Sequence, residues 1–346
     1  MKQTAAGVNM KVSIWHNNND IRIKEVPTPV PGPKEMLVKV MSCGICGSDT
    51  VEWYRLPRAP LVQGHEPGAQ VVQTGAAVKK FKPGDRVFIA PKVPCGQCYY
   101  CKKGHHPQCT GAKERLPGSF AQYILVPETI IEKGTYLLPD HVSYDQSTFI
   151  EPLACVIRAQ KLAGIKAGQT VLVLGCGMSG LLHVKYAKSK RARVIATDIK
   201  ASRLELARKN GADPAINAVG NAAQLLLDQT GRKADIVILS TASMTAVEQA
   251  WECVDKGGAV VFFAVPDPDL RVSIPINDFW TREIRVLTSY YCGPPDLAEA
   301  LELIASGEIE VDDMITHTLS LDDIEKGFQL VLEGKDSLKV IIRPNQ

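Results

Sequence analysis

The stretch TVLVLGCGMSG, residues 170–180, places an apolar run directly before three glycines in the pattern GxGxxG. A helical pattern follows to about Ser189, and a second apolar run, from Arg193, ends at Asp198. A strand, a glycine-rich turn and a helix in this order are typical of a dinucleotide-binding fold, because glycines let the backbone approach a pyrophosphate at the helix N-terminus. This context disfavours the alternative, a glycine-rich turn that binds nothing.

The alternation of strand and helix patterns continues beyond this point. Strands that alternate with helices predict a doubly wound parallel sheet, and therefore an α/β fold class. The sheet has six strands only if the weakly marked segment near 214–216 is one of them. Further strands are expected near 214–216, 235–239, 259–264 and 284–288, with a helix near 246–254.

The dinucleotide is expected to contact the glycine turn and the acidic residue after the second strand. Asp198 can accept hydrogen bonds from both hydroxyls of the adenine ribose, and its charge would repel a 2′-phosphate, so NAD is predicted over NADP. Lys200 and Arg203 are an alternative phosphate contact, although each is also typical of a solvated helix face. The predicted cofactor contacts are Gly175, Gly177, Met178, Ser179, Gly180, Asp198 and Arg203.

The part of the chain before residue 150 has a different pattern, rich in proline and glycine with short alternating segments. This pattern predicts a β-rich domain with loops. After residue 289, two helical patterns and a strand-like segment near 339–342 are interpreted as completing that first domain. The short strands are expected near 36–41, 69–73, 86–90 and 120–126.

A stretch of fifteen residues, CGQCYYCKKGHHPQC at 95–109, contains four cysteines. Thiolates spaced by two, two and seven residues can converge on one tetrahedral Zn²⁺. Four sulfurs leave no open coordination position, so this zinc is predicted to be structural, and His105 and His106 are interpreted as loop residues. The predicted ligands are Cys95, Cys98, Cys101 and Cys109.

A second metal centre is suggested by groups that lie further apart in the sequence. Cys43, the adjacent pair His65 and Glu66, and Glu151 offer a thiolate, an imidazole and carboxylates. Three such ligands leave a position open for water or substrate, as a catalytic zinc needs. Taken singly, each of these residues is at least as typical of a core or surface position, and their separation does not show that they meet.

Length and composition limit the kind of protein. At 346 residues the expectation is two domains, and an apolar fraction of 45% supports two cores. The net charge of +3, from 40 basic and 37 acidic residues, gives no basic stripe, so no nucleic-acid partner is expected. Without a bilayer-spanning apolar run or a signal peptide, no membrane association is expected, and a cytoplasmic location with reduced thiols is predicted.

Several segments carry a resemblance to a known family. In order, and across essentially the whole chain, they resemble the zinc-containing medium-chain dehydrogenase/reductase superfamily, and within it the sorbitol (polyol) dehydrogenase-like branch. The segments are CGICGSD (43–49), GHEPGAQVV (64–72), PGDRV (83–87), the four-cysteine stretch, GSFAQYILVP (118–127), EPLACVIRA (151–159) and the glycine turn VLGCGMSG.

The resemblance implies an arrangement of two domains. A GroES-like β-rich catalytic domain, 1–152 with 290–346, carries the structural zinc lobe 95–109, and a Rossmann NAD-binding domain occupies 153–289. Two Zn²⁺ per chain and NAD are the implied cofactors. The implied assembly is a homodimer or homotetramer, associated through the sheet edge near 259–264.

Residue by residue, the resemblance implies a catalytic zinc held by Cys43, His65 and Glu151. Glu66 matches a glutamate that binds zinc directly or exchanges with water. Because both glutamates together would make the site net negative and a weaker Lewis acid, they are expected to alternate. Cys46, although it stands in a CxxC spacing, is interpreted as structural.

The resemblance also assigns roles around the zinc. Asp49 matches the carboxylate that supports the liganding histidine, and Ser48 matches the relay hydroxyl for the alcohol proton, with a turn former as the alternative. The relay histidine usual three residues after the serine is replaced by Val51. Either Glu52, or Glu151 with ordered water, is then expected to carry the proton.

The predicted function is oxidation of a secondary alcohol, polyol or cyclitol-like, to a ketone with NAD and zinc. Val51 and Tyr290, which stands where sorbitol-type enzymes have an arginine, motivate an alternative: the same chemistry on a hydrophobic or anionic (phosphorylated or CoA-linked) alcohol. Arg55, Arg58 and Arg115 suit an anion, although scattered surface arginines are ordinary. The alternative of another class is a non-catalytic protein that binds NAD and zinc, which the intact set of site residues opposes.

Overall fold

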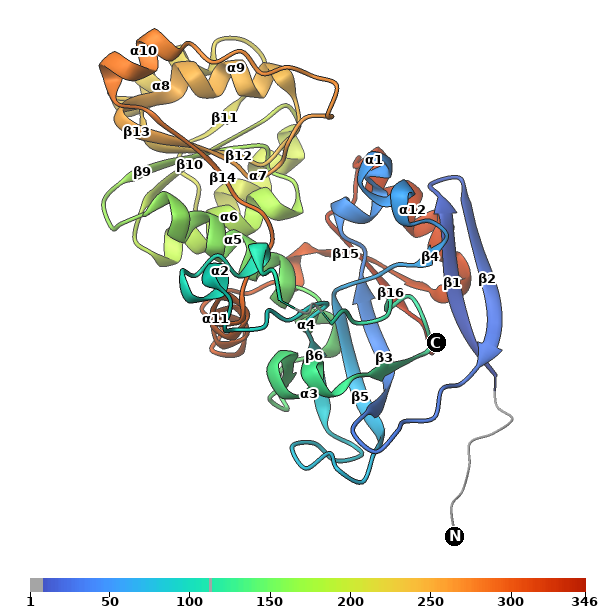
Figure 1. Ribbon diagram of the computed structural model, residues 1–346. Helices are drawn as coiled ribbons and strands as arrows, with labels where there is room; N and C mark the ends of the chain where they lie inside the picture. The colour runs from blue at the N-terminus through green and yellow to red at the C-terminus, as the bar shows by residue number, and fades with distance from the viewer. Residues whose placement is uncertain (1–8, 112–113) are drawn as a thin grey trace. The chain divides into compact units, whose positions relative to one another are not determined.

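The computed structural model describes residues 9–111 and 114–346, which divide into two compact units (Figure 1). The first unit comprises 1–152 and 292–346, and the second comprises 153–291. The chain therefore re-enters the first unit at Cys292, two residues after the boundary expected from the sequence. Within the described residues, no helix is both long and apolar enough to cross a membrane.

The first unit contains two β-sheets. A three-stranded sheet has the order β2-β1-β4, and a seven-stranded sheet has the order β15-β16-β3-β5-β6-β8, with β7 also paired to β3. The strands are β1 (Asn9–Asn17), β2 (Asp20–Pro27), β3 (Met36–Gly44), β4 (Leu61–Val62), β5 (Pro67–Thr74), β6 (Arg86–Ile89), β7 (Tyr123–Val126), β8 (Thr135–Leu137), β15 (Ile315–Ser320) and β16 (Lys339–Arg343).

Strand β3 lies at the centre of the larger sheet, because three strands pair with it. Antiparallel β16 places Ile342 opposite Cys43, and antiparallel β5 places Pro67 opposite the same residue. β3 consists largely of buried apolar residues, as expected for a strand covered on both faces. The register therefore brings three segments together, around residues 44, 66 and 340, that are far apart in the sequence.

Short helices complete the first unit. On α12, Phe328 is fully buried and its ring packs edge-on against Phe120 at a centroid distance of 5.9 Å. This contact fixes α12 over the core of the larger sheet. The helices are α1 (Glu52–Arg55), α2 (Tyr99–Lys102), α3 (Glu128–Gly134), α4 (Tyr144–Ser147), α11 (Pro294–Ala305) and α12 (Ile324–Glu333), and α5 (Ile150–Ala163) begins here and continues into the second unit.

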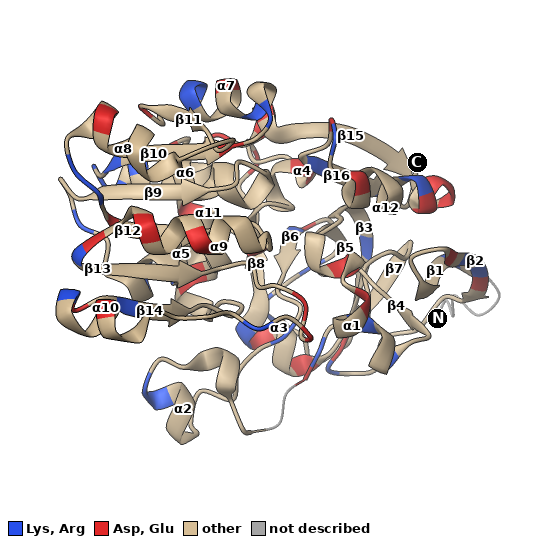
Figure 2. Cartoon of the chain, turned by 90° about the horizontal axis from the view of Figure 1, so that it is seen from above, with Lys and Arg blue, Asp and Glu red and all other residues tan. Residues whose placement is uncertain are grey.

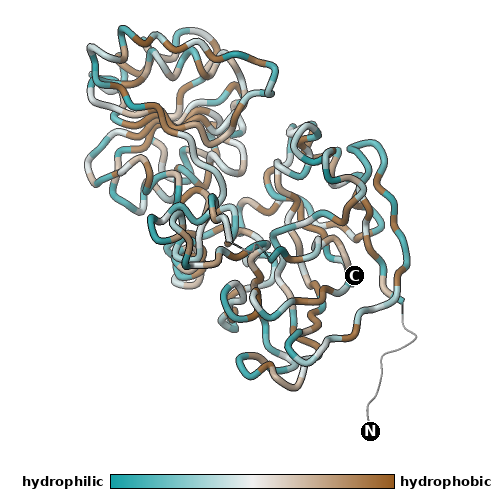
Figure 3. Tube along the Cα trace, in the orientation of Figure 1, coloured by the Kyte–Doolittle hydropathy of each residue, from teal (hydrophilic) through white to brown (hydrophobic). Residues whose placement is uncertain are grey.

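The second unit is a six-stranded parallel sheet of order β11-β10-β9-β12-β13-β14. Helices cover both faces, and the hydropathy colouring shows an apolar sheet between more polar helices (Figure 3). The predicted α/β fold with a doubly wound sheet is confirmed. The elements are β9 (Thr170–Leu174), α6 (Met178–Ser189), β10 (Arg193–Asp198), α7 (Ala201–Lys209), β11 (Ala215–Asn217), α8 (Ala222–Thr230), β12 (Ala234–Leu239), α9 (Met244–Cys253), β13 (Val254–Phe262), α10 (Ile276–Arg282) and β14 (Arg285–Thr288).

The edge of this sheet differs from the expectation. The segment predicted as the edge, 259–264, belongs largely to β13, which pairs with β12 on one side and with β14 on the other. That prediction is wrong, because 285–288 adds one further strand. β14 is the edge on this side of the sheet.

Charged residues of both signs are interspersed along the chain (Figure 2). The sequence has 40 basic and 37 acidic residues, which is close to a balance. The fully buried strand β9 carries no charged residue at all.

Candidate functional site

The four cysteines of the 95–109 lobe converge on one point. Their sulfur atoms all lie within 4.8 Å of one another, with Cys98 Sγ 3.5 Å from Cys101 Sγ and 3.9 Å from Cys109 Sγ. Gly111 closes the cluster, since a Cβ there would lie 2.7 Å from Cys95 Sγ. This geometry suits a tetrahedral ion with four thiolate ligands.

Backbone groups prepare these thiols for a metal. The N–H groups of Cys101 and Thr110 lower the pKa of Cys98 to about 5, and N–H groups of the same loop also lower the pKa of Cys95. The Cys98 backbone N–H donates to Cys95 Sγ at 3.4 Å. Because the thiolate is the metal-binding form, the loop favours at Cys95 and Cys98 the state that a zinc ion needs, whereas burial raises the pKa of Cys101 to about 12.

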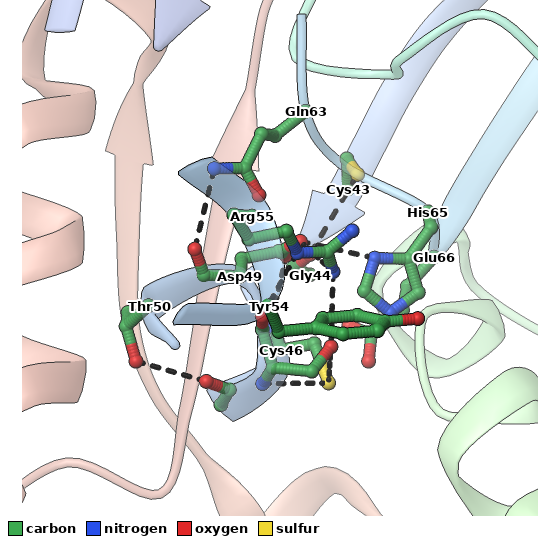
Figure 4. A network of polar contacts seen from close by, with 12 residues as sticks. Cys43, Gly44, Cys46, Asp49, Thr50, Tyr54, Arg55, Gln63, His65 and Glu66 are labelled. Carbon is green, nitrogen blue, oxygen red and sulfur yellow. Dashed lines mark hydrogen bonds and ion pairs between the residues drawn. The ribbon is translucent and has the colours of Figure 1, made fainter. Parts of the chain in front are cut away.

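A second group of potential ligands lies at one end of β3 and β5. Among the described residues, one ligand atom from each of Cys46, His65 and Glu66 lies within 4.8 Å of the others (Figure 4). Cys46 is the N-cap of a short 3-10 helix, Gly47–Thr50, and the His-Glu pair immediately precedes β5. Thiolate, imidazole and carboxylate are the donors expected of a zinc site with an open position.

Cys43 does not belong to this group. It lies within β3, is fully buried, and forms part of the apolar core of the first unit. Burial raises the pKa of its thiol, and its sulfur contacts the Gly44 carbonyl oxygen at 3.7 Å. The structure thus exchanges the two expected roles: Cys43 is a core residue, and Cys46, interpreted as structural, stands with His65 and Glu66.

Asp49 organises the group from behind. Its side chain is fully buried; Oδ1 accepts from His65 Nδ1 at 3.2 Å and from Arg55 Nη2 at 2.7 Å. Oδ2 accepts from the Cys46 backbone N–H at 3.1 Å. Burial alone would raise the pKa of Asp49, but the neighbouring His65 and Arg55 outweigh it, and the pKa lies below its usual value.

The same contact acts on the histidine. Burial disfavours the charged imidazole, but the Asp49 carboxylate more than offsets this, and the pKa of His65 lies well above its usual value in the metal-free protein. The bond to Asp49 uses Nδ1, so Nε2 is the nitrogen that remains for a metal ion.

Arg55 was not predicted as part of the site. Its guanidinium is only 12% exposed, and besides Asp49 it binds Ser48, with Nη2 3.0 Å from Ser48 Oγ and Nε 2.9 Å from the Ser48 carbonyl oxygen. Ser48 Oγ in turn donates to Cys46 Sγ at 3.3 Å. The interpretation of Arg55 as a surface arginine is wrong, because α1 turns its side chain inward over Ser48.

The proton route suggested for Glu52 is not supported. Its Oε1 accepts from the Asn18 backbone N–H at 2.9 Å, which ties α1 to the turn after β1. Val51, beside it, offers no polar side-chain atom. In the same segment, Ser48 places its hydroxyl against the ligand group, 3.3 Å from Cys46 Sγ.

A second cation was missed by the sequence reasoning. Lys339, the first residue of β16, is fully buried, and its Nζ lies 2.5 Å from Glu66 Oε2. The other carboxylate oxygen, Glu66 Oε1, is buried and has no hydrogen-bond partner within the described part of the chain. Only the register of β16 on β3 reveals this pair, because 273 residues separate its members.

Glu151 lies outside the group around Cys46. It is buried near the start of α5, and its carboxylate lies within 4.8 Å of Cys292 Sγ. Of the predicted ligands, the structure therefore brings His65 and Glu66 together. It places Cys46 beside them and Glu151 beside Cys292.

In the second unit, the glycine turn has the conformation that the sequence predicts. Gly175 has φ +93°, in the left-handed region, and α6 begins at Met178 with Gly177 as its N-cap. A Cβ at Gly180 would collide with the Gly175 carbonyl oxygen, whereas a Cβ at Gly177 would meet only Arg203 Nη1, at 3.9 Å. The turn thus packs tightly against its own helix and leaves open space at its tip, where a pyrophosphate fits.

Asp198 ends β10 beside this turn. Its Oδ2 accepts from the Cys176 backbone N–H at 2.8 Å, and its Oδ1 accepts from the Lys200 backbone N–H at 2.8 Å. Arg203 Nη1 lies 4.0 Å from Oδ2, so Asp198 and Arg203 share the region where the adenine ribose is expected. Ser179 lies in the first turn of α6, next to Met178.

Two family models match parts of this chain. Residues 32–140 match the family model of the alcohol dehydrogenase GroES-like domain, and residues 180–306 match that of the zinc-binding dehydrogenases. Sorbitol dehydrogenase of Bacillus subtilis is 30% identical, and the match covers 98% of each chain. Erythritol/L-threitol dehydrogenase of Mycolicibacterium smegmatis is 34% identical, over 97% of this chain and 98% of the other.

The chain belongs to the zinc-containing medium-chain dehydrogenases. Among solved structures, a zinc-binding dehydrogenase from Sinorhizobium meliloti, bound to NADP, has a TM-score of 0.86 at 32% identity and covers 97% and 100% of the two chains. 2R,3R-butanediol dehydrogenase from Bacillus subtilis has a TM-score of 0.84 at 28% identity and covers 97% and 99% of the two chains. The predicted membership, in the sorbitol dehydrogenase-like branch, is confirmed, and the chain is an oxidoreductase that acts on CH–OH groups.

The donor atoms fit the zinc of this dehydrogenase family. Cys46, His65 and Glu66 supply sulfur, nitrogen and oxygen ligands, and the partnerless buried Glu66 Oε1 is an acceptor that a cation would satisfy. The open tip of the glycine turn at Gly177 fits the dinucleotide. Sequence reasoning missed Cys46, Arg55 and Lys339; the only available signal for the first was its position directly before Gly-Ser-Asp.

Proposed function

We propose that this dehydrogenase oxidises a secondary alcohol of a polyol to a ketone, with zinc and NAD. The Cys46–His65–Glu66 group, with the Ser48 hydroxyl beside it, is the observation that carries the proposal. The names of three relatives, which act on sorbitol, erythritol or L-threitol, and butanediol, support a small polyhydroxylated substrate.

In this proposal Cys46 takes the place first given to Cys43 among the zinc ligands. His65 binds through Nε2, because Asp49 holds its Nδ1. Glu66 is the exchanging ligand. Glu151 stays a proposed ligand on the resemblance alone, as it lies with Cys292 instead.

Zinc supplies Lewis acidity at the alcohol oxygen, and the nicotinamide ring supplies the hydride acceptor. Ser48 is placed to receive the alcohol proton, because its hydroxyl lies against the ligand group. Arg55 fixes this hydroxyl but cannot take its proton, since a guanidinium stays charged at all working pH values. The proton therefore leaves Ser48 by a route that includes neither Arg55 nor Val51.

NAD is proposed over NADP because the Asp198 carboxylate lies where the ribose 2′-position is expected. The solved relatives differ in this respect: the Sinorhizobium meliloti protein holds NADP, and one from Escherichia coli CFT073, 27% identical, holds NADH. Arg203 is the residue through which a 2′-phosphate would bind. The kcat/KM values for the two cofactors, in the parent and in Asp198→Ser, test the choice; a parent that prefers NADP contradicts it.

The first unit is proposed as the catalytic domain, with a structural zinc in the 95–109 lobe, and the second as the cofactor domain. The edge strand β14 is the proposed route to a homodimer or homotetramer, since an unpaired edge can extend a sheet between copies. A cytoplasmic location is proposed because all ten cysteines are free thiols.

The proposal is tested by zinc content and NADH formation on the same samples. Elemental analysis should give about two zinc ions per chain, and a panel of diols, polyols and phosphorylated polyols should yield NADH only with zinc present. Turnover confined to phosphorylated or strongly apolar alcohols would shift the substrate class while keeping the chemistry. One zinc per chain, and no turnover on any member, would identify a non-catalytic binding protein.

A further inference from the structure

The Glu66–Lys339 ion pair is buried on both sides. Each side chain is fully buried, and Nζ lies 2.5 Å from Oε2. Three neighbouring backbone segments fix it: Gly44 N–H donates to the Glu66 carbonyl oxygen at 3.3 Å, and Ile45 N–H donates to the Val340 carbonyl oxygen at 2.9 Å. The pair is therefore held by the sheet itself and not by flexible loops.

The pair is packed closely against Gly44 and Phe149. A Cβ on Gly44 would lie 2.5 Å from Lys339 Nζ and closer still to Glu66 Oε2. On the other side, Lys339 Nζ lies 5.0 Å above the centre of the Phe149 ring, which favours a cation at this point. Of the two residues, Glu66 is the one that belongs to the ligand group with Cys46 and His65.

The two carboxylate oxygens of Glu66 have different surroundings. Oε2 is bound to Lys339, whereas Oε1 is buried and has no hydrogen-bond partner among the described residues, and a carboxylate oxygen of Glu66 lies within 4.8 Å of ligand atoms of Cys46 and His65. A zinc ion held by Cys46 and His65 would compete with Lys339 for the same carboxylate. The relative strength of these two interactions of Glu66, with zinc and with Lys339, determines whether the remaining zinc position is filled by glutamate or is open.

We propose that Lys339 is a positioning residue that restrains Glu66 and so keeps a zinc coordination position open for the alcohol. Its charge offsets that of Glu66 and, at a buried site of low dielectric, opposes transfer of the carboxylate to the metal. The inference rests on the proposed zinc site. It assigns a role in that site to a residue 273 positions away in the chain.

Lys339→Met tests this role, because the two possible functions of the lysine predict opposite signs. If Lys339 restrains Glu66, its removal lets the carboxylate bind zinc permanently. Zinc release to a chelator then slows about ten- to hundredfold, and kcat falls by a similar factor. If Lys339 only supports the fold, zinc is released faster than from the parent, which overturns the proposal. Lys339→Arg, which keeps the charge, should stay close to the parent in both measurements.

The double variant Lys339→Met/Glu66→Gln separates the restraint from general damage. Without the carboxylate there is nothing to restrain, so zinc release should return to the rate of Glu66→Gln alone; a double variant that still retains zinc as strongly as Lys339→Met overturns the proposal. The double variant buries no unpaired charge, so it can be measured even if Lys339→Met alone does not fold. Co²⁺ substitution gives an independent readout, since its visible spectrum should change in Lys339→Met and not in Lys339→Arg.

Failure of the inference is distinguishable from failure of the proposed function. If Cys46→Ser keeps the full zinc content of the parent, the zinc site itself is misplaced. If Cys46→Ser loses one zinc but Lys339→Met releases that zinc faster, the site stands and the role of Lys339 is wrong.

Discussion

The first unit holds two candidate zinc centres that are built in opposite ways. The four ligands of the lobe, Cys95 to Cys109, are all thiols and come from one stretch of fifteen residues, and N–H groups of the same loop lower the pKa of two of them, Cys95 and Cys98. The centre at Cys46 takes ligands from two segments and has charged residues from two more, Arg55 and Lys339, behind it. A closed, local centre can be recognised from spacing, whereas an open centre depends on how distant segments pair.

The largest expected effect separates Cys46 from Cys43. Cys46→Ser should lose one zinc per chain and lower kcat/KM by at least about a thousandfold, equivalent to about 4 kcal/mol. Cys43→Ser places a hydroxyl in the core, which should cost about 1–3 kcal/mol of stability and leave kcat/KM within a few-fold of the parent. Metal analysis and steady-state kinetics of both variants test whether Cys46, and not Cys43, binds the zinc ion. Equal zinc loss in the two variants would contradict this assignment.

Removing a ligand from the four-cysteine lobe should lower thermal stability more than it lowers kcat. Cys109→Ser removes a buried sulfur from the lobe and should cost its zinc, which lowers the midpoint of thermal unfolding by about 10 °C. kcat, corrected for folded enzyme, should fall much less than in Cys46→Ser. If thermal stability is unchanged while kcat collapses, the lobe is not a structural centre.

Arg55 and Arg58 offer a matched pair at the open centre. Both guanidinium groups lie over the Tyr54 ring, at 5.1 and 4.7 Å from its centre, but only Arg55 reaches Asp49 and Ser48. Arg55→Met should therefore lower kcat about ten- to hundredfold, because charge-assisted hydrogen bonds are worth about 1.5–3 kcal/mol.

Arg58→Met, which loses only surface contacts, is the control and should keep the kcat of the parent. Added guanidinium should partly restore Arg55→Met. Equal losses in the two variants would show that the stack on Tyr54, rather than the bonds to Asp49 and Ser48, matters.

The smallest effect concerns a histidine of the second unit that contrasts with His65. His183 is fully buried beside Gln160, and burial lowers its pKa to about 3. The unfolded chain binds a proton near pH 6.5 and the folded chain does not, so stability falls as pH drops below about 6.5, by up to about 1.4 kcal/mol per pH unit.

Chemical denaturation of the parent and of His183→Leu between pH 7 and 5 measures this slope. The difference between the two proteins should be flat above about pH 6.5 and change steadily below it. A difference that is independent of pH would mean that His183 takes up its proton in the folded state.

Much of the fold could be predicted because its signals are local. Six apolar segments and a glycine turn predict the parallel sheet, and even the weakly marked 214–216 contains part of β11. The short strands of the first unit were harder to find. β2 alternates only over its first half, where Ile21 and Ile23 are half-buried, and its second half begins with the charged, exposed Lys24 and Glu25. Strand order was not predictable, and the misplaced sheet edge at 259–264 followed from this.

The candidate site could be predicted only in part, for a related reason. CGIC contains two cysteines, Cys43 and Cys46, and the sequence does not show where β3 ends between them. Because β3 ends at Gly44, Cys43 lies in the core and Cys46 lies outside the strand. Arg55 looks like a surface residue until α1 turns it inward, and Lys339 looks like an ordinary strand residue until β16 is placed on β3. Local spacing identifies residue types that suit zinc, whereas long-range pairing determines which of them meet.

The position of β16 in the sheet has a consequence for the order of folding during synthesis. β3 leaves the ribosome early, but one of its neighbours in the sheet is not made until residues 339–343 have been translated. The second unit, a continuous segment, is complete before then and can fold first. Until Lys339 has been synthesised, Glu66 cannot form its ion pair. A zinc ion that binds before then can therefore be coordinated by the Glu66 carboxylate.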